Sequence, residues 1–256
     1  MCYKCFWPQP LCWCGSITPM RTRTKFVILM HPHEFKRIKA NTGRLTHLCL
    51  ADSELHIGES FDGHEAVQAL INDPKNYPVL LYPGREALDL STVLKQDPQL
   101  SALNTQLQQR QLLVFLLDAT WRLARPMLRL SASLQRLPRI MFSNAAPSRY
   151  IIKRQPEPGC LSTLEATHEL LLALDRSGLD HYALPKQMLD LFMRMQEVQI
   201  TRTAENRRLG IRRHALKVPR ERPSVMPPPR PKRHRIFPKG PAQPPATGPG
   251  PKSLSG

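Results

Sequence analysis

The chain has 256 residues, of which 41% are hydrophobic, so it can form one domain with a real core and short appendages. Its formal net charge of +17 favours a polyanionic partner, with RNA or DNA ahead of an acidic membrane surface. No apolar run approaches the roughly 20 residues of a spanning helix, and the N-terminus lacks the regions of a signal peptide, so we expect a cytoplasmic protein with reduced cysteines.

The sequence divides into three regions. Residues 1–20 contain a cysteine cluster, residues 21–214 have the pattern of an α/β body, and residues 215–256 are basic and rich in proline. Residues 201–256 carry 14 Lys or Arg against 2 Asp or Glu, which accounts for +12 of the net charge. We expect this tail to be disordered, because it has few large apolar residues to bury. It either attracts phosphates without regard to sequence or only improves solubility.

Short apolar runs alternate with amphipathic segments along the body. The runs predict five strands, at 25–30, 45–51, 78–84, 112–118 and 138–143. Helical patterns occupy 33–41, 64–73, 101–111, 121–134, about 162–176 and about 185–205. This alternation predicts an α/β fold with a mostly parallel sheet flanked by helices. Ligands bind such sheets at the carboxyl ends of the strands, where His31, Tyr82, Asp118 and Ser143 fall.

Four cysteines near the N-terminus have the spacing of metal ligands. Cys2 and Cys5 form a C-x-x-C pair, and Cys12 and Cys14 form a C-x-C pair. Four thiolates suit a tetrahedral zinc ion, which would also stabilise a short segment with little else to bury. Such an ion has no open position, so we expect it to be structural, with unrelated thiols or a redox pair as the alternatives. Cys49 is expected to be a small core residue.

The segment after the first strand contains His31, His33 and Glu34, which are residue types that can bind metals. No third ligand cluster accompanies them, so we interpret the segment as a helix start with Pro32 in an early position. The residues Asn41-Thr42-Gly43 are then expected to end that helix, because glycine accepts a left-handed conformation. Capping and a functional role remain equally open for these residues.

The strand at 112–118 ends on Asp118, and an amphipathic segment starts three residues later at Trp121. Asp118 or Thr120 could simply cap that helix, or the carboxylate could act on a ligand. Gly84 lies where another strand gives way to a loop, which permits close approach of a ligand to the backbone. The chain has no G-x-G-x-x-G motif or phosphate-cradling loop, which disfavours dinucleotide and ATP sites.

Residues 143–165 mix small, basic and aromatic side chains before a helix. Several of them have the chemistry to bind phosphates and unstacked bases, unless they form an ordinary solvated loop. These residues are Ser148, Arg149, Tyr150, Lys153 and Arg154. Ser162 and Glu165 form a predicted capping box at the start of the next helix. The same helix N-terminus could receive an anionic group of a ligand.

Five segments occur in the order seen in one protein family. They are the two cysteine pairs, HPHEFKRIKANTGRL, LYPG, DATW and SRYIIKRQPEPGCLSTLEA. Roughly residues 1–200 therefore resemble the DTW-domain proteins, which are tRNA-uridine aminocarboxypropyltransferases. Asp118, Thr120 and Trp121 match the D-x-T-W signature of that family. The resemblance implies an S-adenosylmethionine-dependent enzyme of the SPOUT-related class with a knotted α/β core, although knots are rare among proteins.

The resemblance also implies a reaction and a set of site residues. The 3-amino-3-carboxypropyl group of S-adenosylmethionine would move to N3 of a tRNA uridine in the variable loop, leaving methylthioadenosine. Asp118 would take the N3 proton or hold the amino group of the cosubstrate, with Thr120 beside it and Trp121 stacked on a base. The residues expected around the cosubstrate are Leu81, Tyr82, Pro83, Gly84, Ser143, Leu161, Ser162, Thr163 and Glu165. The residues expected to bind RNA are Arg122, Arg125, Arg149, Tyr150, Lys153 and Arg154.

Two other functions fit the same residues. An RNA methyltransferase would keep the cosubstrate and transfer a different group. A non-catalytic protein would bind RNA through the zinc element and the basic tail alone. Ribosomal RNA is the alternative substrate, although the cysteine cluster favours tRNA. Neither a membrane nor an obligate protein partner is expected.

Overall fold

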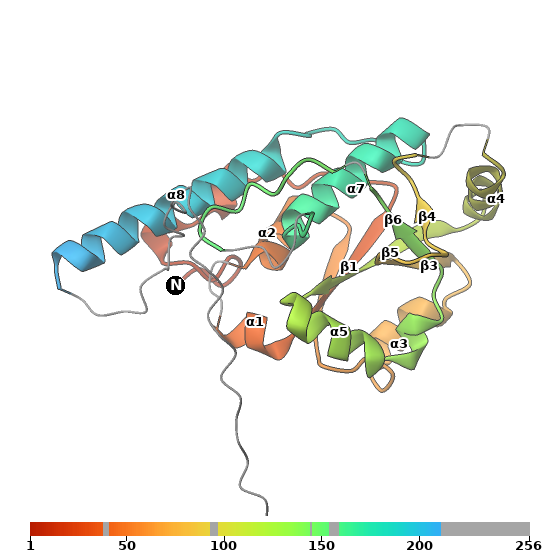
Figure 1. Ribbon diagram of the computed structural model, residues 1–256, viewed down its shortest axis with the longest axis horizontal. Coiled ribbons are helices and arrows are strands. Elements are labelled where there is room, and N and C mark those ends of the chain that lie inside the picture. The colour runs from red at the N-terminus through yellow and green to blue at the C-terminus, as the bar shows by residue number, and fades with distance from the viewer. Residues whose placement is uncertain (38–40, 93–96, 144, 154–158, 211–256) are drawn as a thin grey trace, which may run out of the picture. The chain divides into compact units, whose positions relative to one another are not determined.

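Figure 1 shows the computed structural model of the chain, which describes residues 1–37, 41–92, 97–143, 145–153 and 159–210. The described residues belong to one compact unit. The tail at 215–256, with its predicted disorder, lies outside the described residues, and so does Arg154. No helix within the described ranges combines the length and the hydrophobicity needed to cross a membrane.

Strands and helices alternate through the described residues. The strands are β1 Lys25–Met30, β2 Ser53–Ile57, β3 Asn76–Leu81, β4 Leu88–Asp89, β5 Gln111–Asp118 and β6 Arg139–Met141. The α-helices are α1 Pro32–Arg37, α2 Thr42–Cys49, α3 Glu65–Asn72, α4 Pro98–Leu107, α5 Trp121–Arg129, α6 Ala132–Gln135, α7 Thr163–Ser177 and α8 Gln187–Arg208. Two short 3-10 helices, η1 Gln9–Leu11 and η2 Cys14–Ser16, lie in the N-terminal segment.

The six strands form one sheet in the order β2-β1-β5-β3-β6-β4. Every pair of neighbouring strands is parallel. The prediction of an α/β fold with a parallel sheet flanked by helices is therefore confirmed, whereas the knotted core stays a prediction. The long apolar strands β1 and β5 lie side by side in the interior of the sheet, where both of their faces are covered.

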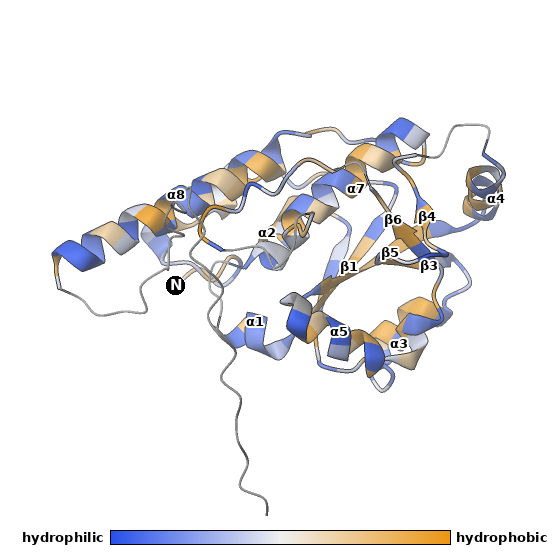
Figure 2. Ribbon diagram, viewed as in Figure 1, coloured by the Kyte–Doolittle hydropathy of each residue, from blue (hydrophilic) through white to orange (hydrophobic). Residues whose placement is uncertain are grey.

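Alternate residues of the central strands contribute to two separate hydrophobic cores. Phe26 and Ile28 of β1 join the core beneath α2, α7 and α8, while Val27 and Leu29 face the core beneath α3, α5 and α6. Figure 1 shows α2, α7 and α8 on one side of the sheet and α3 and α5 on the other. Apolar residues accordingly concentrate in the strands, and the helices carry polar residues on their outer surfaces (Figure 2). Successive residues of a strand point to opposite faces of the sheet, so each central strand contributes side chains to both cores.

The predicted strand at 45–51 is wrong, because this segment belongs to helix α2. Asn41 caps the start of α2 with its side-chain oxygen, which accepts a hydrogen bond of 2.8 Å from the backbone N–H of Arg44. Leu45 and Cys49, one helical turn apart, are then both buried in the core shared with α7 and α8. Gly43 lies inside this helix, so Asn41-Thr42-Gly43 begins a helix rather than ending one.

Two strands were not predicted from the sequence. One of them is β2, the second strand along the chain. Its side chains are mostly half-buried and are less apolar than those of β1. The other is β4, which has only two residues. The amphipathic segment predicted at 121–134 is divided into α5 and α6, with Pro126 inside α5. The remaining strands and helices occur close to the predicted ranges.

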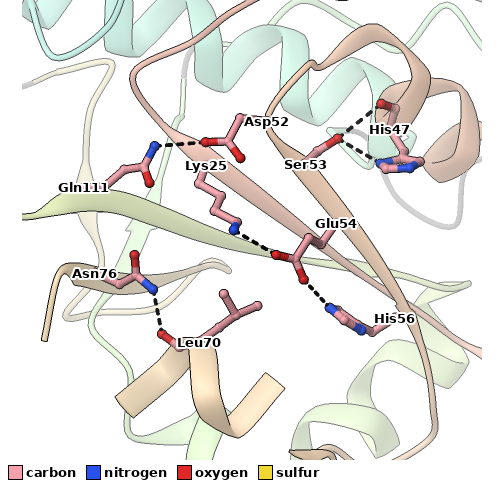
Figure 3. Close-up of polar contacts among 9 residues, drawn as sticks. All are labelled: Lys25, His47, Asp52, Ser53, Glu54, His56, Leu70, Asn76 and Gln111. Carbon is pink, nitrogen blue, oxygen red and sulfur yellow. Dashed lines mark hydrogen bonds and ion pairs between the residues drawn. The ribbon is translucent and has the colours of Figure 1, made fainter. Parts of the chain in front are cut away.

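Polar contacts hold the edge strand β2 against its neighbours (Figure 3). The ammonium group of Lys25 in β1 lies 2.8 Å from the carboxylate of Glu54 in β2, and the other oxygen of Glu54 lies 2.9 Å from Nε2 of His56. The hydroxyl of Ser53 lies 2.8 Å from Nδ1 of His47 in α2. These contacts join the edge strand β2 to β1 and to α2.

The N-terminal segment packs on the body of the protein. The rings of Trp7 and Trp13 meet edge to face at 4.8 Å between centroids, and both are buried in the core that also contains α2 and α8. Cys5 is only 1% exposed in the same core. The cysteine-bearing segment is therefore part of the same hydrophobic core as the sheet and these helices.

Candidate active site

A cavity of about 710 Å³ opens at the carboxyl edge of the sheet. Its volume lies within the range of small-molecule sites. It is lined by the ends of β3, β5 and β6, by the starts of α2, α5 and α7, and by the loop before α7. The lining residues include Glu34, Thr42, Leu81, Tyr82, Pro83, Asp118, Thr120, Arg122, Phe142, Tyr150, Lys153, Leu161, Ser162 and Thr163. The structure thus places a ligand-sized cavity at the edge of the sheet that the sequence indicated.

Asp118, the last residue of β5, lies at the centre of this site and is 3% exposed. One carboxylate oxygen accepts a hydrogen bond of 2.6 Å from the hydroxyl of Thr163, the first residue of α7. The other accepts a bond of 3.0 Å from the side-chain amide of Asn41. Both oxygens are therefore held by groups from other elements, so the carboxylate has a defined position. A role limited to capping α5 does not account for these contacts.

Gly43 in α2 lies directly against the Asp118 carboxylate. A Cβ atom at Gly43 would lie 2.5 Å from Oδ2 and 2.7 Å from Oδ1 of Asp118. Any side chain at position 43 would therefore displace the carboxylate. This close approach, rather than a left-handed turn, is the physical reason for a glycine at this position.

Burial raises the pKa of the Asp118 carboxyl group, because the charged form is poorly solvated there. The hydrogen bonds from Thr163 and Asn41 oppose this shift, while the nearby carboxylate of Glu34 adds to it. Lys153 acts in the opposite direction as a nearby cation. A carboxylate with a raised pKa can accept and release a proton nearer to neutral pH than an exposed aspartate.

The predicted capping box at the start of α7 is confirmed. The hydroxyl of Ser162 accepts a bond from the backbone N–H of Glu165, whose carboxylate accepts one of 2.9 Å from the backbone N–H of Ser162. Glu165 also accepts bonds from the hydroxyl of Ser148 and the backbone N–H of Arg149. Glu165 is thus a buried anchor for the loop before α7, and it does not line the cavity.

The structure brings together most of the residues expected around a cosubstrate, but three of the nine lie apart from the cavity wall. Gly84 and Glu165 are outside the lining, and so is Ser143, whose backbone N–H donates to the hydroxyl of Ser91. The residues expected to bind the cosubstrate that do line the cavity are Leu81, Tyr82, Pro83, Leu161, Ser162 and Thr163.

The residues expected to bind RNA are divided in the same way. Arg122, Tyr150 and Lys153 line the cavity, whereas Arg125 and Arg149 do not. Arg154 lies outside the described residues. Of the signature residues, Thr120 lines the cavity beside Asp118. Trp121 is the first residue of α5, and the structure does not describe its side chain.

Two residues at the centre of the site were not selected from the sequence as site residues. Glu34 in α1 is 5% exposed and lines the cavity, and Asn41 is 3% exposed and bonds to Asp118. His31 instead accepts a hydrogen bond of 3.0 Å from the backbone N–H of His33 at the start of α1. An asparagine before a helical segment is a typical N-cap, which is the signal that could have placed Asn41 at a helix start.

The four N-terminal cysteines form a cluster that can hold a metal ion. All four sulfur atoms lie within 4.8 Å of one another. The pairs Cys2–Cys14 and Cys5–Cys12 are each separated by 3.8 Å. Sulfur atoms at about 2.3 Å from a tetrahedral zinc ion are about 3.8 Å apart, so the arrangement fits zinc. Backbone hydrogen bonds from Cys5 and Lys4 lower the pKa of the Cys2 thiol to about 6, whereas burial and the neighbouring cysteines raise the pKa of the Cys14 thiol to about 12.

The fold and the site together define an α/β protein with a ligand cavity around a buried carboxylate and a separate four-cysteine metal cluster. The family model of the DTW domain matches residues 1–200. The chain therefore belongs to the DTW-domain family.

Curated relatives carry the name tRNA-uridine aminocarboxypropyltransferase 2. The protein of that name from Drosophila melanogaster is 30% identical over 181 residues, which cover 68% of this chain and 66% of the relative. The one from Mus musculus is 28% identical over 211 residues, which cover 80% of this chain and 67% of the relative. The chain thus spans about two thirds of the length of these relatives. No solved structure matches the chain.

Proposed function

We propose that this protein transfers the 3-amino-3-carboxypropyl group of S-adenosylmethionine to N3 of a tRNA uridine in the variable loop, releasing methylthioadenosine. The names of its relatives support the transferase class and the tRNA substrate. The observation that carries the proposal is the Asp118 carboxylate, which is buried at the wall of a ligand-sized cavity and held by two hydrogen bonds. The reaction needs a base at such a position. A tRNA substrate also agrees with the cytoplasmic location expected from the sequence.

In this mechanism the Asp118 carboxylate takes the proton from N3 of the uridine. The N3 electron pair forms a bond to the aminocarboxypropyl carbon that is attached to the positively charged sulfur. The bond between that carbon and the sulfur breaks. The sulfur keeps the electron pair of the broken carbon–sulfur bond and leaves as the neutral thioether of methylthioadenosine. The raised pKa of Asp118 makes it a stronger base than an ordinary aspartate, and Thr163 and Asn41 orient its oxygens. Positioning of the two reactants supplies most of the rate enhancement.

The other lining residues bind and enclose the reactants. Leu81, Tyr82 and Pro83 line the cavity and form an apolar wall for the adenosine part of the cosubstrate. Arg122 and Lys153 supply positive charge at the cavity for RNA phosphates or for the carboxylate of the cosubstrate. Trp121 stacks on a base, and Arg125, Arg149 and Arg154 bind the RNA.

The cysteine cluster holds zinc in a structural role. Its four sulfur atoms would complete the ligand shell of a zinc ion, which would leave no position for a reactant. The residues around it, Trp7 and Trp13, join the core shared with α2. The three predicted regions, 1–20, 21–214 and 215–256, and the knotted SPOUT-like core are part of the same proposal.

The test is mass spectrometry of nucleosides from unmodified tRNA incubated with the protein and S-adenosylmethionine. We expect an aminocarboxypropyl uridine with the wild type and none with Asp118→Asn. A methylated nucleoside would replace this proposal with a methyltransferase. Cosubstrate-independent RNA binding with no product on tRNA or ribosomal RNA would replace it with a non-catalytic RNA-binding protein.

A further inference from the structure

The Glu34 carboxylate is buried, and no cationic side chain that the structure describes pairs with it. It is 5% exposed and lines the cavity, and it accepts a long hydrogen bond of 3.5 Å from the Asn41 amide. Among the side chains that the structure describes, no lysine or arginine forms an ion pair with it. A buried carboxylate is usually paired, because losing water is costly for a charge. The first turn of α1 offsets part of that cost through the helix dipole, and a cation in the cavity would offset more.

The amide of Asn41 links Glu34 to Asp118. Its side-chain oxygen is committed to the backbone N–H of Arg44 at the start of α2, so its Nδ2 group points to the carboxylates. That group donates to Asp118 at 3.0 Å and to Glu34 at 3.5 Å. Asp118 receives a second strong bond from Thr163. Glu34 is the less saturated acceptor of the two, so it is the carboxylate with capacity for a ligand.

A second acceptor faces the same part of the cavity. The hydroxyl oxygen of Tyr150 is buried and has no hydrogen-bond partner among the described residues. Glu34, Asp118 and Tyr150 all line this cavity. Burial raises the pKa of the Tyr150 hydroxyl, and the carboxylates of Glu34 and Asp118 add to the shift. The Lys153 ammonium group lies over the Tyr150 ring, 5.4 Å from its centroid, and both residues line the cavity. This corner of the cavity thus offers acceptors for an ammonium group and a cation for a carboxylate.

We propose that Glu34 binds the α-ammonium group of the aminocarboxypropyl part of the donor, with Asn41 as the residue that positions Glu34 and Asp118. This assignment rests on the proposed function and divides the work of the two carboxylates. Asp118 accepts the proton from uridine, and Glu34 recognises the amino acid part of the donor. Tyr150 adds a second acceptor for the ammonium group, and Lys153 pairs with its carboxylate.

Calorimetric binding of two ligands tests the assignment without turnover. S-adenosylhomocysteine retains the ammonium group, and methylthioadenosine lacks the whole aminocarboxypropyl part. We expect Glu34→Gln to weaken S-adenosylhomocysteine about 10- to 100-fold, which is typical for a lost hydrogen bond to a charged group, and to leave methylthioadenosine within about twofold. Glu59→Gln is the matched control, because Glu59 is 65% exposed and lies 3.8 Å from His31. It should leave both affinities unchanged.

A deaminated analogue of S-adenosylhomocysteine completes a double-mutant cycle, in which the Glu34 carboxylate and the ammonium group of the ligand are each removed. The wild type should bind it about 10- to 100-fold more weakly than the parent ligand, and Glu34→Gln should lose most of this preference, because only Tyr150 then remains as an acceptor. The wild-type comparison stands even if Glu34→Gln does not fold. Equal losses for S-adenosylhomocysteine and methylthioadenosine, or no preference of the wild type for the amino group, would overturn the role of Glu34. A wild type that binds neither ligand would instead overturn the proposed donor.

Discussion

Replacing Gly43 with alanine tests whether catalysis needs Asp118 where the structure holds it. The added Cβ atom would lie 2.5 Å from Oδ2 and 2.7 Å from Oδ1 of Asp118. Atoms that are not bonded pack at about 3.5 Å, so the carboxylate has to move by about 1 Å. That movement lengthens its hydrogen bonds to Thr163, now 2.6 Å, and to Asn41, now 3.0 Å.

A misplacement of about 1 Å can lower a rate about 100-fold, so we expect kcat for aminocarboxypropyl transfer to fall about 100-fold in Gly43→Ala. The free energy of unfolding should fall as well. Complete loss of two hydrogen bonds to a carboxylate would cost about 3–6 kcal/mol, against about 0.5–1 kcal/mol gained by replacing a helical glycine. The assay is nucleoside mass spectrometry at several times, run below the unfolding temperature of the variant.

Gly63→Ala is the matched control, because nothing lies within 4 Å of a Cβ atom at Gly63. It should retain wild-type activity and stability. A folded Gly43→Ala protein with wild-type kcat would refute the reasoning, since Asp118 would then act equally well from a shifted position.

Three further predictions concern the site, the metal cluster and the tail. Because burial raises the pKa of Asp118, its contribution to stability falls as the pH rises from the ordinary carboxyl range through that raised pKa. The free energy of unfolding of Asp118→Asn should therefore exceed that of the wild type by more at about pH 8 than at about pH 4. Urea titrations at the two pH values measure these differences, and equal differences would contradict the raised pKa of Asp118. Cys5→Ser should lose bound zinc and unfold at a lower temperature, while Cys49→Ser, which changes a buried cysteine of α2, should keep the metal in elemental analysis. Deleting residues 215–256 should flatten the salt dependence of tRNA binding without moving the modified nucleotide, and a changed position would show that the tail selects the site.

Local patterns in the sequence are enough to place many elements of this fold. The strand predicted at 25–30 coincides with β1, because five consecutive buried residues of this strand are apolar. The capping box at Ser162 and Glu165 was also predictable, since it depends on two residues three positions apart. The wrong strand at 45–51 shows the limit of such patterns. A short apolar run fits a strand or a helix, and the Asn41 cap and the packing on α7 decide for the helix.

The candidate site depends on both levels. Composition and motif order were sufficient to indicate Asp118, the cysteine cluster and the family, because each motif involved is a short continuous segment. The same patterns could not predict the contacts of Asp118, because Thr163 is 45 residues away along the chain and Asn41 is 77 residues away. Parallel strands bring distant segments to one edge of the sheet, and no periodic pattern records which side chains meet there. Only the folded chain shows that Glu34 shares the Asn41 amide with Asp118 and that Gly43 leaves room for the carboxylate.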